Sequence, residues 1–189
     1  MNQNDNEFNE SESKTPNKKY EVIEFVKTIA WVLILAFVIR TFVFTATVVN
    51  GESMTPTLQN GDRLIALKFP LYYRGPEYSE IVVLKDPQGS KRDFIKRVIA
   101  LPGDKVDIID GKVFVNDKEI SEPYIDEGLL TMTADSNSWK LGENQYFVMG
   151  DNRHPGGSHD SRAFGQVDKK ELVGISTVRF WPINRIGNP

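Results

Sequence analysis

Two residues of this chain could supply a nucleophile and its base: Ser53, in a loop-like stretch, and Lys96, in an apolar one. A serine hydroxyl attacks a carbonyl only when a base takes its proton. A lysine can be that base when burial among apolar side chains keeps its amine neutral. In a strand, Lys96 would share a face with Phe94 and Val98, which should be a buried face. The alternative for the same stretch is an ordinary surface lysine.

The two histidines, His154 and His159, offer a rival chemistry. Ser158, His159 and Asp160 are adjacent, and neighbouring residues generally cannot aim their side chains at one another as a catalytic triad requires. A metal site from the histidines with Asp151 and Asp160 is the other option, but no helix or strand spacing organises such ligands. The absence of cysteine removes disulfides, thiolate catalysis and Cys-ligated metals. We therefore predict no metal and no cofactor.

Length and charge limit the possible domain organisation and the possible binding partners. A length of 189 residues suggests one ordinary domain with appendages. With 23 basic and 26 acidic residues the formal net charge is −3, so we expect no attraction to nucleic acid.

The N-terminal part is expected to anchor the chain. Residues 1–22 are polar and predict a flexible tail. Residues 23–45 are strongly apolar and predict a membrane-spanning helix, with Lys27 and Arg40 reaching opposite interfaces and Trp31 as an interfacial residue. A cleaved signal peptide and a buried core helix are the rivals. Lysines on the N-terminal side, among them Lys14 and Lys18, predict a single-pass cell-membrane protein with a cytoplasmic N-terminus.

Residues 46–189 are expected to form an extracytoplasmic, mainly β domain of packed or coiled antiparallel sheets. Asp110-Gly111 is a strong two-residue hairpin signal, and Asn116-Asp117 suggests a second reversal. Residues 105–145 would then form a smaller inserted β excursion. Short runs rich in β-branched and aliphatic residues predict the strands: 63–67, 80–84, 94–100, 105–109, 112–115, 145–149 and 171–181.

Two further segments lie outside these strands. Residues 69–73 are apolar but contain Pro70, which disfavours a central strand; loop packing and a patch that dips into the bilayer are equally good interpretations. Residues 121–143 are polar and irregular, and predict an exposed excursion without chemistry.

Several short stretches follow one another along the chain: GESMTPTL at 51–58, GD at 61–62, KR at 96–97 with LPGD at 101–104, GDNR at 150–153, Ser158, and DSR at 160–162. Taken in order, they resemble the successive boxes of bacterial type I signal peptidases, a serine–lysine peptidase family. The resemblance covers most of residues 40–182, with an apolar segment immediately upstream.

The resemblance implies that Ser53 is the nucleophile and Lys96 its general base. It implies that Ser158 orients the lysine, and that the Asp160–Arg162 pair supports the scaffold. Further scaffold residues would be Arg97 and the stretch from Gly150 through Asp151 to Arg153.

The resemblance also implies an oxyanion hole formed by the backbone N–H of Ser53. Some relatives carry a serine two residues before the nucleophile; here that position is Gly51, which has no hydroxyl. Met54 would line the substrate groove. The lysine base and the single anchor resemble the prokaryotic branch and its Gram-positive members.

One departure concerns the loop before Ser158. The family usually has two residues between the arginine of its Gly-Asp-Asn-Arg box and the serine, whereas this chain has four, residues 154–157. A glycine pair could absorb them as a bulge. The departure bears on the role of Ser158 more than on Ser53 or Lys96.

The resulting hypothesis is a membrane-bound serine endopeptidase that removes signal peptides with small residues at positions −1 and −3 from exported preproteins. Its partners would be those preproteins and the lipid bilayer; no oligomeric state is predicted. A self-cleaving repressor with the same chemistry is disfavoured because no helix-turn-helix pattern is present. A non-enzymatic β-module that binds exported chains is the third option, although it would need neither Ser53 nor Lys96.

Overall fold

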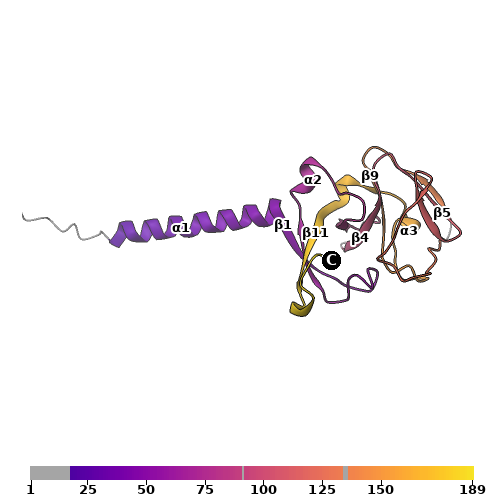
Figure 1. Cartoon of the computed structure of the whole chain (residues 1–189). Helices are drawn as coiled ribbons and strands as arrows, with labels where there is room; N and C mark the ends of the chain where they lie inside the picture. The colour runs from indigo at the N-terminus through magenta and orange to yellow at the C-terminus, as the bar shows by residue number, and fades with distance from the viewer. Residues whose placement is uncertain (1–17, 91, 134–135) are drawn as a thin grey trace, which may run out of the picture. The chain divides into compact units, whose positions relative to one another are not determined.

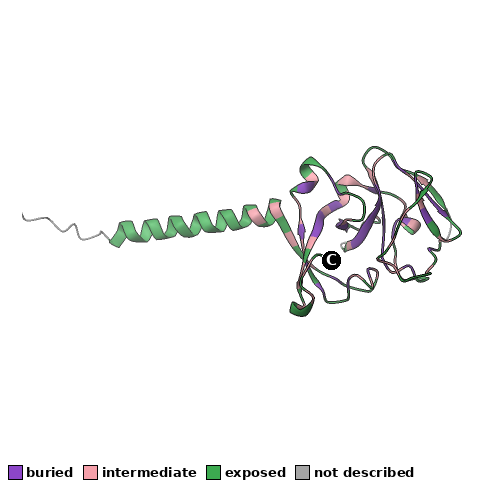
Figure 2. Cartoon of the chain, in the orientation of Figure 1, coloured by how far each residue is buried: buried purple, intermediate pink, exposed green. Residues whose placement is uncertain are grey.

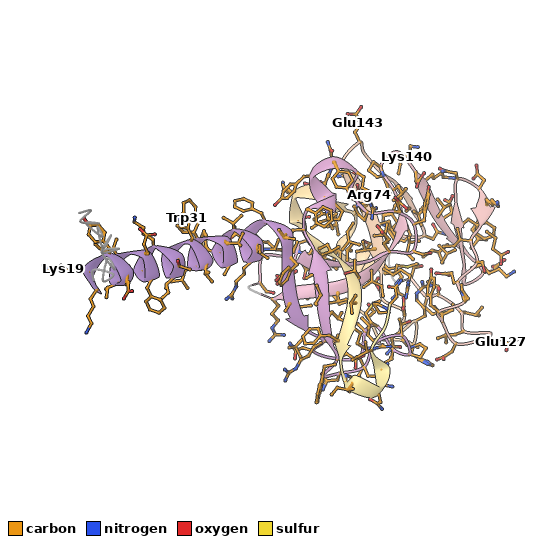
Figure 3. The ribbon with its side chains drawn as sticks, turned by 60° about the vertical axis from the view of Figure 1, so that its left-hand side comes forward. Lys19, Trp31, Arg74, Glu127, Lys140 and Glu143 are labelled. Atoms are coloured by element: carbon orange, nitrogen blue, oxygen red, sulfur yellow. The ribbon has the colours of Figure 1, made fainter. Side chains whose placement is uncertain are left out.

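The computed structural model describes residues 18–90, 92–133 and 136–189. The chain divides into two units between Val38 and Ile39. The first contains helix α1 (Lys18–Val38), which a π-helical turn, Ile39–Val43, continues along the chain. None of the residues of α1 is buried, and Figure 2 shows the helix exposed along its length. The side chain of Trp31 projects outward from it (Figure 3).

The segment Lys18–Val43 is long and apolar enough to cross a membrane. It differs at both ends from the predicted span of residues 23–45. The helix already begins at Lys18, so residues 18–22 of the predicted tail are helical and the remainder of that tail lies outside the described residues. At the other end Phe44 and Thr45 belong to a strand, because they pair with the next strand of the β domain.

The second unit confirms the predicted mainly β fold (Figure 1). Its larger sheet has seven strands in the order β1-β2-β11-β3-β4-β9-β10, and its smaller sheet has four in the order β7-β6-β5-β8, with antiparallel pairing throughout the described residues. The larger sheet contains β1 (Phe44–Val48), β2 (Arg63–Leu67), β3 (Ile81–Lys85), β4 (Asp93–Ala100), β9 (Gln145–Met149), β10 (Val167–Asp168) and β11 (Leu172–Trp181). The smaller sheet contains β5 (Lys105–Ile109), β6 (Lys112–Val115), β7 (Lys118–Glu119) and β8 (Ser138–Lys140). Short helical turns complete the unit: α2 (Pro70–Tyr73), α3 (Ser161–Phe164), Lys169–Glu171 and Ile183–Arg185.

Both predicted reversals are present in the smaller sheet. Asp110 and Gly111 have φ angles of 50° and 77° and join β5 to β6, while Asn116 and Asp117 have 51° and 64° and join β6 to β7. Positive φ at both central residues is the geometry that matches the twist of a two-residue hairpin. The predicted strands recur within a residue or two of their expected bounds, whereas β1, β7, β8 and β10 were not predicted.

The strand pairing of β4 sets the positions of Lys96 and Arg97. Lys96 lies opposite Val82 of β3, and Arg97 lies opposite Ile81 of β3 and Met149 of β9. Successive side chains of a strand point to opposite faces, so the side chains of Lys96 and Arg97 project from opposite faces of the sheet.

Residues 69–73 form α2 and its N-cap, with Pro70 at the first helical position, where its missing N–H costs nothing. The expectation for residues 121–143 is wrong in part. Thr131 is buried, Glu122 forms an ion pair with the buried Arg153, and residues 138–140 form β8. A buried arginine needs a charged partner, and this polar segment supplies it.

Candidate active site

The structure brings Ser53 and Lys96 together. Ser53 lies in the loop between β1 and β2, and Lys96 projects from β4. The Lys96 Nζ and the Ser53 Oγ are 2.7 Å apart, in a hydrogen bond between groups 43 positions apart in the chain. This is within the distance over which a base can take a hydroxyl proton.

The loop that carries Ser53 is held by two hydrogen bonds and by two buried apolar side chains. The Gly51 N–H donates to Asn60 Oδ1 (2.9 Å), and Gly51 adopts a φ of +100°, which favours glycine. The Asn152 N–H donates to the Ser53 carbonyl (3.1 Å). Met54 and Leu58 are 1% and 0% exposed and pack in a core cluster with residues of β2, β3 and β4. The structure therefore places Met54 in the core beneath the loop, not on a groove surface, because it is the apolar residue that anchors the loop.

The environment of Lys96 favours its neutral form. The side chain is buried, and this desolvation lowers the pKa of its amine from 10.5 to about 8. The negative charge of Asp160 opposes the shift, the positive charge of Arg162 adds to it, and Asp151 opposes it. The amine also lies 5.6 Å from the centre of the Phe94 ring, its neighbour on the same face of β4. The predicted burial of this lysine is thus what the structure shows.

Gly150 is the point where the three site segments meet. A Cβ at this position would lie 2.3 Å from both Ser158 Oγ and the Ser53 carbonyl oxygen, so a side chain cannot be accommodated without movement. The Ser158 hydroxyl oxygen is buried and has no hydrogen-bond partner among the described residues. The four residues before Ser158 close as a turn, with Gly157 N–H donating to the His154 carbonyl (2.8 Å) and Gly156 at a φ of +74°. Residues 154–157 therefore form a closed turn, and Ser158 packs against Gly150.

Asp160 and Arg162 form the predicted pair. Arg162 donates to both carboxylate oxygens of Asp160 through Nε and Nη2, each at 2.8 Å, and the Gly150 N–H donates to the same carboxylate (3.0 Å). Burial alone would raise the pKa of Asp160, but the hydrogen bonds and charge of Arg162 and the Gly150 N–H hold it below the ordinary value. The carboxylate also caps α3 by accepting from the Arg162 N–H. This charged pair is fully partnered and positions Gly150.

Arg97 and Asp151 form a second buried pair on the other face of β4. The guanidinium donates to both carboxylate oxygens at 2.8 and 2.6 Å, and Thr57 Oγ1 donates to Asp151 at 2.6 Å. The Arg97 guanidinium stacks 4.1 Å from the centre of the Tyr124 ring. Because Thr57 belongs to the same loop as Ser53, this network connects that loop with β4 and with the residues after β9.

Some partners of the supporting residues were missed by sequence reasoning. Arg153, one of the expected scaffold residues, is 0% exposed; it donates to the Gly150 carbonyl (2.8 Å) and Thr131 Oγ1 (2.7 Å), and forms an ion pair with Glu122. No local pattern in the sequence signals that Glu122, Thr131, Thr57 and Tyr124 partner residues of the site.

The histidines have other neighbours. His154 Nε2 lies 3.3 Å from Asp126, and His159 Nε2 lies 3.2 Å from Gln88 Oε1. Within the part of the chain that the structure describes, no three His, Cys, Asp or Glu residues are grouped so that they could hold a metal ion.

Comparison with known proteins identifies the family. A β domain with a buried amine against a serine hydroxyl is the kind of site a serine hydrolase uses. Residues 22–181 match the family described as "Signal peptidase, peptidase S26". The chain is 40% identical to signal peptidase I P of Bacillus subtilis subsp. natto, over 92% of this chain and 96% of that protein. It is 39% identical to signal peptidase I of Bacillus licheniformis (93% and 97%) and 34% identical to signal peptidase IB of Staphylococcus aureus strain COL (88% and 93%).

A crystal structure of a signal peptidase I from Enterococcus faecalis V583 matches with a TM-score of 0.45 and 28% identity, over 54% of this chain and 97% of that chain. The chain belongs to the signal peptidase family, peptidase S26, whose matched members are signal peptidase I enzymes, a class of serine peptidases.

Proposed function

We propose that this chain is a membrane-bound serine endopeptidase that removes signal peptides from exported preproteins through a Ser53–Lys96 dyad. Family membership supports signal-peptide cleavage by a serine peptidase. The observation that carries the residue assignment is the 2.7 Å contact between the Lys96 Nζ and the Ser53 Oγ. The assignment of Lys96 as the base is also supported by its burial, which lowers the pKa of this amine to about 8.

The reaction follows from this pair. The neutral amine of Lys96 takes the proton of the Ser53 hydroxyl as Oγ attacks the carbonyl carbon of the cleaved bond. The tetrahedral intermediate collapses when Lys96 returns the proton to the leaving amine, which frees the mature protein and leaves the signal peptide esterified to Ser53. A water molecule, deprotonated by Lys96, then hydrolyses the ester and restores the serine. The developing oxyanion would be stabilised by the Ser53 backbone N–H, since Gly51 offers no hydroxyl.

The remaining site residues act through position. Ser158 lies against Gly150 with an unpartnered buried oxygen, so it is the candidate to orient the amine of Lys96. Asp160 with Arg162 positions Gly150, and Arg97 with Asp151 holds the nucleophile loop through Thr57. Each buried cation has a carboxylate partner, which limits the cost of placing these charges beside the dyad.

Substrate class and topology complete the proposal. The extended substrate would carry small residues at positions −1 and −3 and pair with a sheet edge. The candidate span Lys18–Val43 would anchor the enzyme in the cell membrane. Lys18, Lys19 and Lys27 lie on the N-terminal side of its apolar core, which favours a cytoplasmic N-terminus and an extracytoplasmic β domain; Lys14 lies outside the described residues.

The test is cleavage of a preprotein whose signal peptide ends in Ala-x-Ala, by the full chain in detergent or lipid. Ser53→Ala and Lys96→Ala should each abolish cleavage without unfolding the domain, while Lys105→Ala, at a half-exposed lysine of the smaller sheet, should leave it intact. Turnover retained in either dyad variant would refute the dyad. A folded wild type that binds such preproteins without cleaving them would favour a binding module instead.

A further inference from the structure

A basic groove lies beside α2 and β11 of the larger sheet, and neither Ser53 nor Lys96 is among its lining residues. It has a volume of about 710 Å³. Its walls come from the end of β2, from α2, which packs against β11, and from the turn that precedes β11. The lining residues are Lys68, Leu71, Tyr72, Asn144, Asp168, Lys169, Lys170, Leu172 and Val173.

Lys68 ties this groove to the end of the candidate membrane span. Its backbone N–H donates to the Val43 carbonyl (2.8 Å), and its Nζ donates to the carbonyls of Arg40 (3.3 Å) and Thr41 (3.2 Å). These carbonyls belong to the last turn of the segment Lys18–Val43. The last carbonyls of a helix have no hydrogen-bond donor within the helix and carry partial negative charge. The ammonium group of a lysine donates hydrogen bonds to them and compensates this charge. The groove is therefore fixed at the residues where the chain would leave the bilayer.

The groove carries an excess of positive charge. Its lining contains three lysines and one aspartate. Asp168 pairs with Lys170 at 3.1 Å, whereas Lys68 and Lys169 have no carboxylate within ion-pair distance among the described residues. Lys68 is already engaged by backbone carbonyls, and the Lys170–Asp168 pair is an exposed and therefore weak ion pair, so Lys169 and Lys170 are the ammonium groups available to a ligand. Ammonium groups bind phosphate as compact point charges.

Exposed aromatic side chains adjoin the same groove. Phe69, Tyr72 and Tyr73 are 42%, 67% and 69% exposed, and the rings of Phe69 and Tyr73 stack with their centres 6.2 Å apart. Tyrosines are enriched at membrane–water interfaces, where an apolar ring and a polar hydroxyl are both accommodated. Aromatic residues beside lysines indicate an amphipathic ligand, with an anionic head and an apolar body.

We propose that this groove binds the phosphate headgroup of an anionic membrane lipid, with Lys169 and Lys170 as the main contacts and the aromatic residues of α2 among the acyl chains. The inference rests on the proposed membrane anchoring, since it takes residues 40–43 as lying near the bilayer surface. A bound lipid would hold the β domain at that surface, where an extended substrate leaves the membrane.

The test uses the full chain in detergent, titrated with phosphatidylglycerol or phosphatidylcholine, with retained lipid counted by native mass spectrometry. Each lysine near an anionic membrane surface contributes about fivefold in affinity. Lys169→Gln combined with Lys170→Gln should therefore weaken phosphatidylglycerol binding about thirtyfold and leave phosphatidylcholine binding unchanged. Arginine at both positions should retain binding, because the charge is kept.

The matched control is Lys112→Gln combined with Lys118→Gln, which removes the same charge from β6 and β7 of the smaller sheet. It should bind phosphatidylglycerol like the wild type. An equal loss in both double variants, or no loss in either, would overturn the proposal. So would equal binding of the two lipids by the wild type, or displacement of the lipid by an equal concentration of inorganic phosphate.

The outcome is separable from that for the proposed function. Cleavage of a soluble signal-peptide substrate in detergent without anionic lipid should be unchanged in the Lys169/Lys170 double variant. Lipid binding should be unchanged in Lys96→Ala. If the Lys169/Lys170 double variant loses lipid binding but still cleaves the substrate, the result supports lipid binding in the groove independently of the proposed peptidase function. If every glutamine variant still binds the lipid, the lipid proposal is overturned whatever the cleavage result.

Discussion

Replacing Lys96 by methionine should stabilise the protein at neutral pH while it destroys cleavage. In the folded chain the pKa of this amine is about 8, against an ordinary 10.5. At about 1.4 kcal/mol per pKa unit, keeping the amine charged and buried costs about 3 kcal/mol at pH 7. Methionine has a similar length and no charge to bury. The substitution removes one hydrogen bond to Ser53, which contributes about 1 kcal/mol. The free energy of unfolding at pH 7 should therefore increase by about 2 kcal/mol.

The pH dependence of this gain follows from the sign of the shift. A lysine whose folded pKa is lowered binds fewer protons in the folded than in the unfolded state between pH 8 and 10.5. The stability of the wild type should therefore rise relative to Lys96→Met across this window. Above it the variant should be less stable than the wild type by about 1 kcal/mol, the contribution of the lost hydrogen bond to Ser53. Below about pH 8 the advantage should be constant.

The assay is denaturant unfolding of the full chain in detergent at pH 7 and pH 10, for the wild type, Lys96→Met and a control, Lys112→Met. Lys112 is exposed on the smaller sheet, so its variant should differ little from the wild type at either pH. A Lys96→Met protein no more stable than the wild type at pH 7, or a difference that does not narrow at pH 10, would refute the argument that burial lowers the pKa of this amine.

Three further predictions concern activity and the supporting network. The kcat/KM of the wild type should rise with pH through an apparent pKa of about 8, because the proposed mechanism requires the neutral amine of Lys96; a pH-rate profile with its optimum below about pH 6 would contradict this. Gly150→Ala should lower kcat/KM about a hundredfold, since its Cβ would meet Ser158 Oγ and the Ser53 carbonyl at 2.3 Å; near-normal kinetics would show that the site is not held at this point. Asp151→Ala should destabilise the protein by about 3 kcal/mol because Arg97 would be left buried and unpaired; urea unfolding measures the loss, and a change below about 1 kcal/mol would be inconsistent with it.

The sequence was informative where one physical rule decided the outcome. Alternation along β4 placed Lys96 on a buried face, and the structure shows it buried. Asp110-Gly111 specified a tight hairpin because both positions tolerate positive φ, and the turn forms there. The mainly β architecture followed from such short-range signals.

The sequence was less informative where partners come from distant segments. Glu122 and Thr131 belong to a polar stretch with no periodicity, and only the tertiary fold brings them to Arg153. The apolar side chain of Met54 fits equally well in a groove or in a core, and the tertiary fold buries it in a core cluster with residues of β2, β3 and β4. The end of the helix was likewise ambiguous, because Phe44 continues the apolar run although it pairs in β1.

The central claim, that the amine at position 96 is the base for Ser53, is tested most directly by removing that amine and rebuilding it. The chain contains no cysteine, so Lys96→Cys introduces a single thiol that 2-bromoethylamine converts into a lysine-like side chain. The unmodified variant should not cleave a preprotein ending in Ala-x-Ala. The aminoethylated form should recover cleavage, with its pH limb moved to lower pH because the sulfur lowers the pKa of the new amine. Cleavage by the unmodified variant, or a folded aminoethylated protein without activity, would contradict the account.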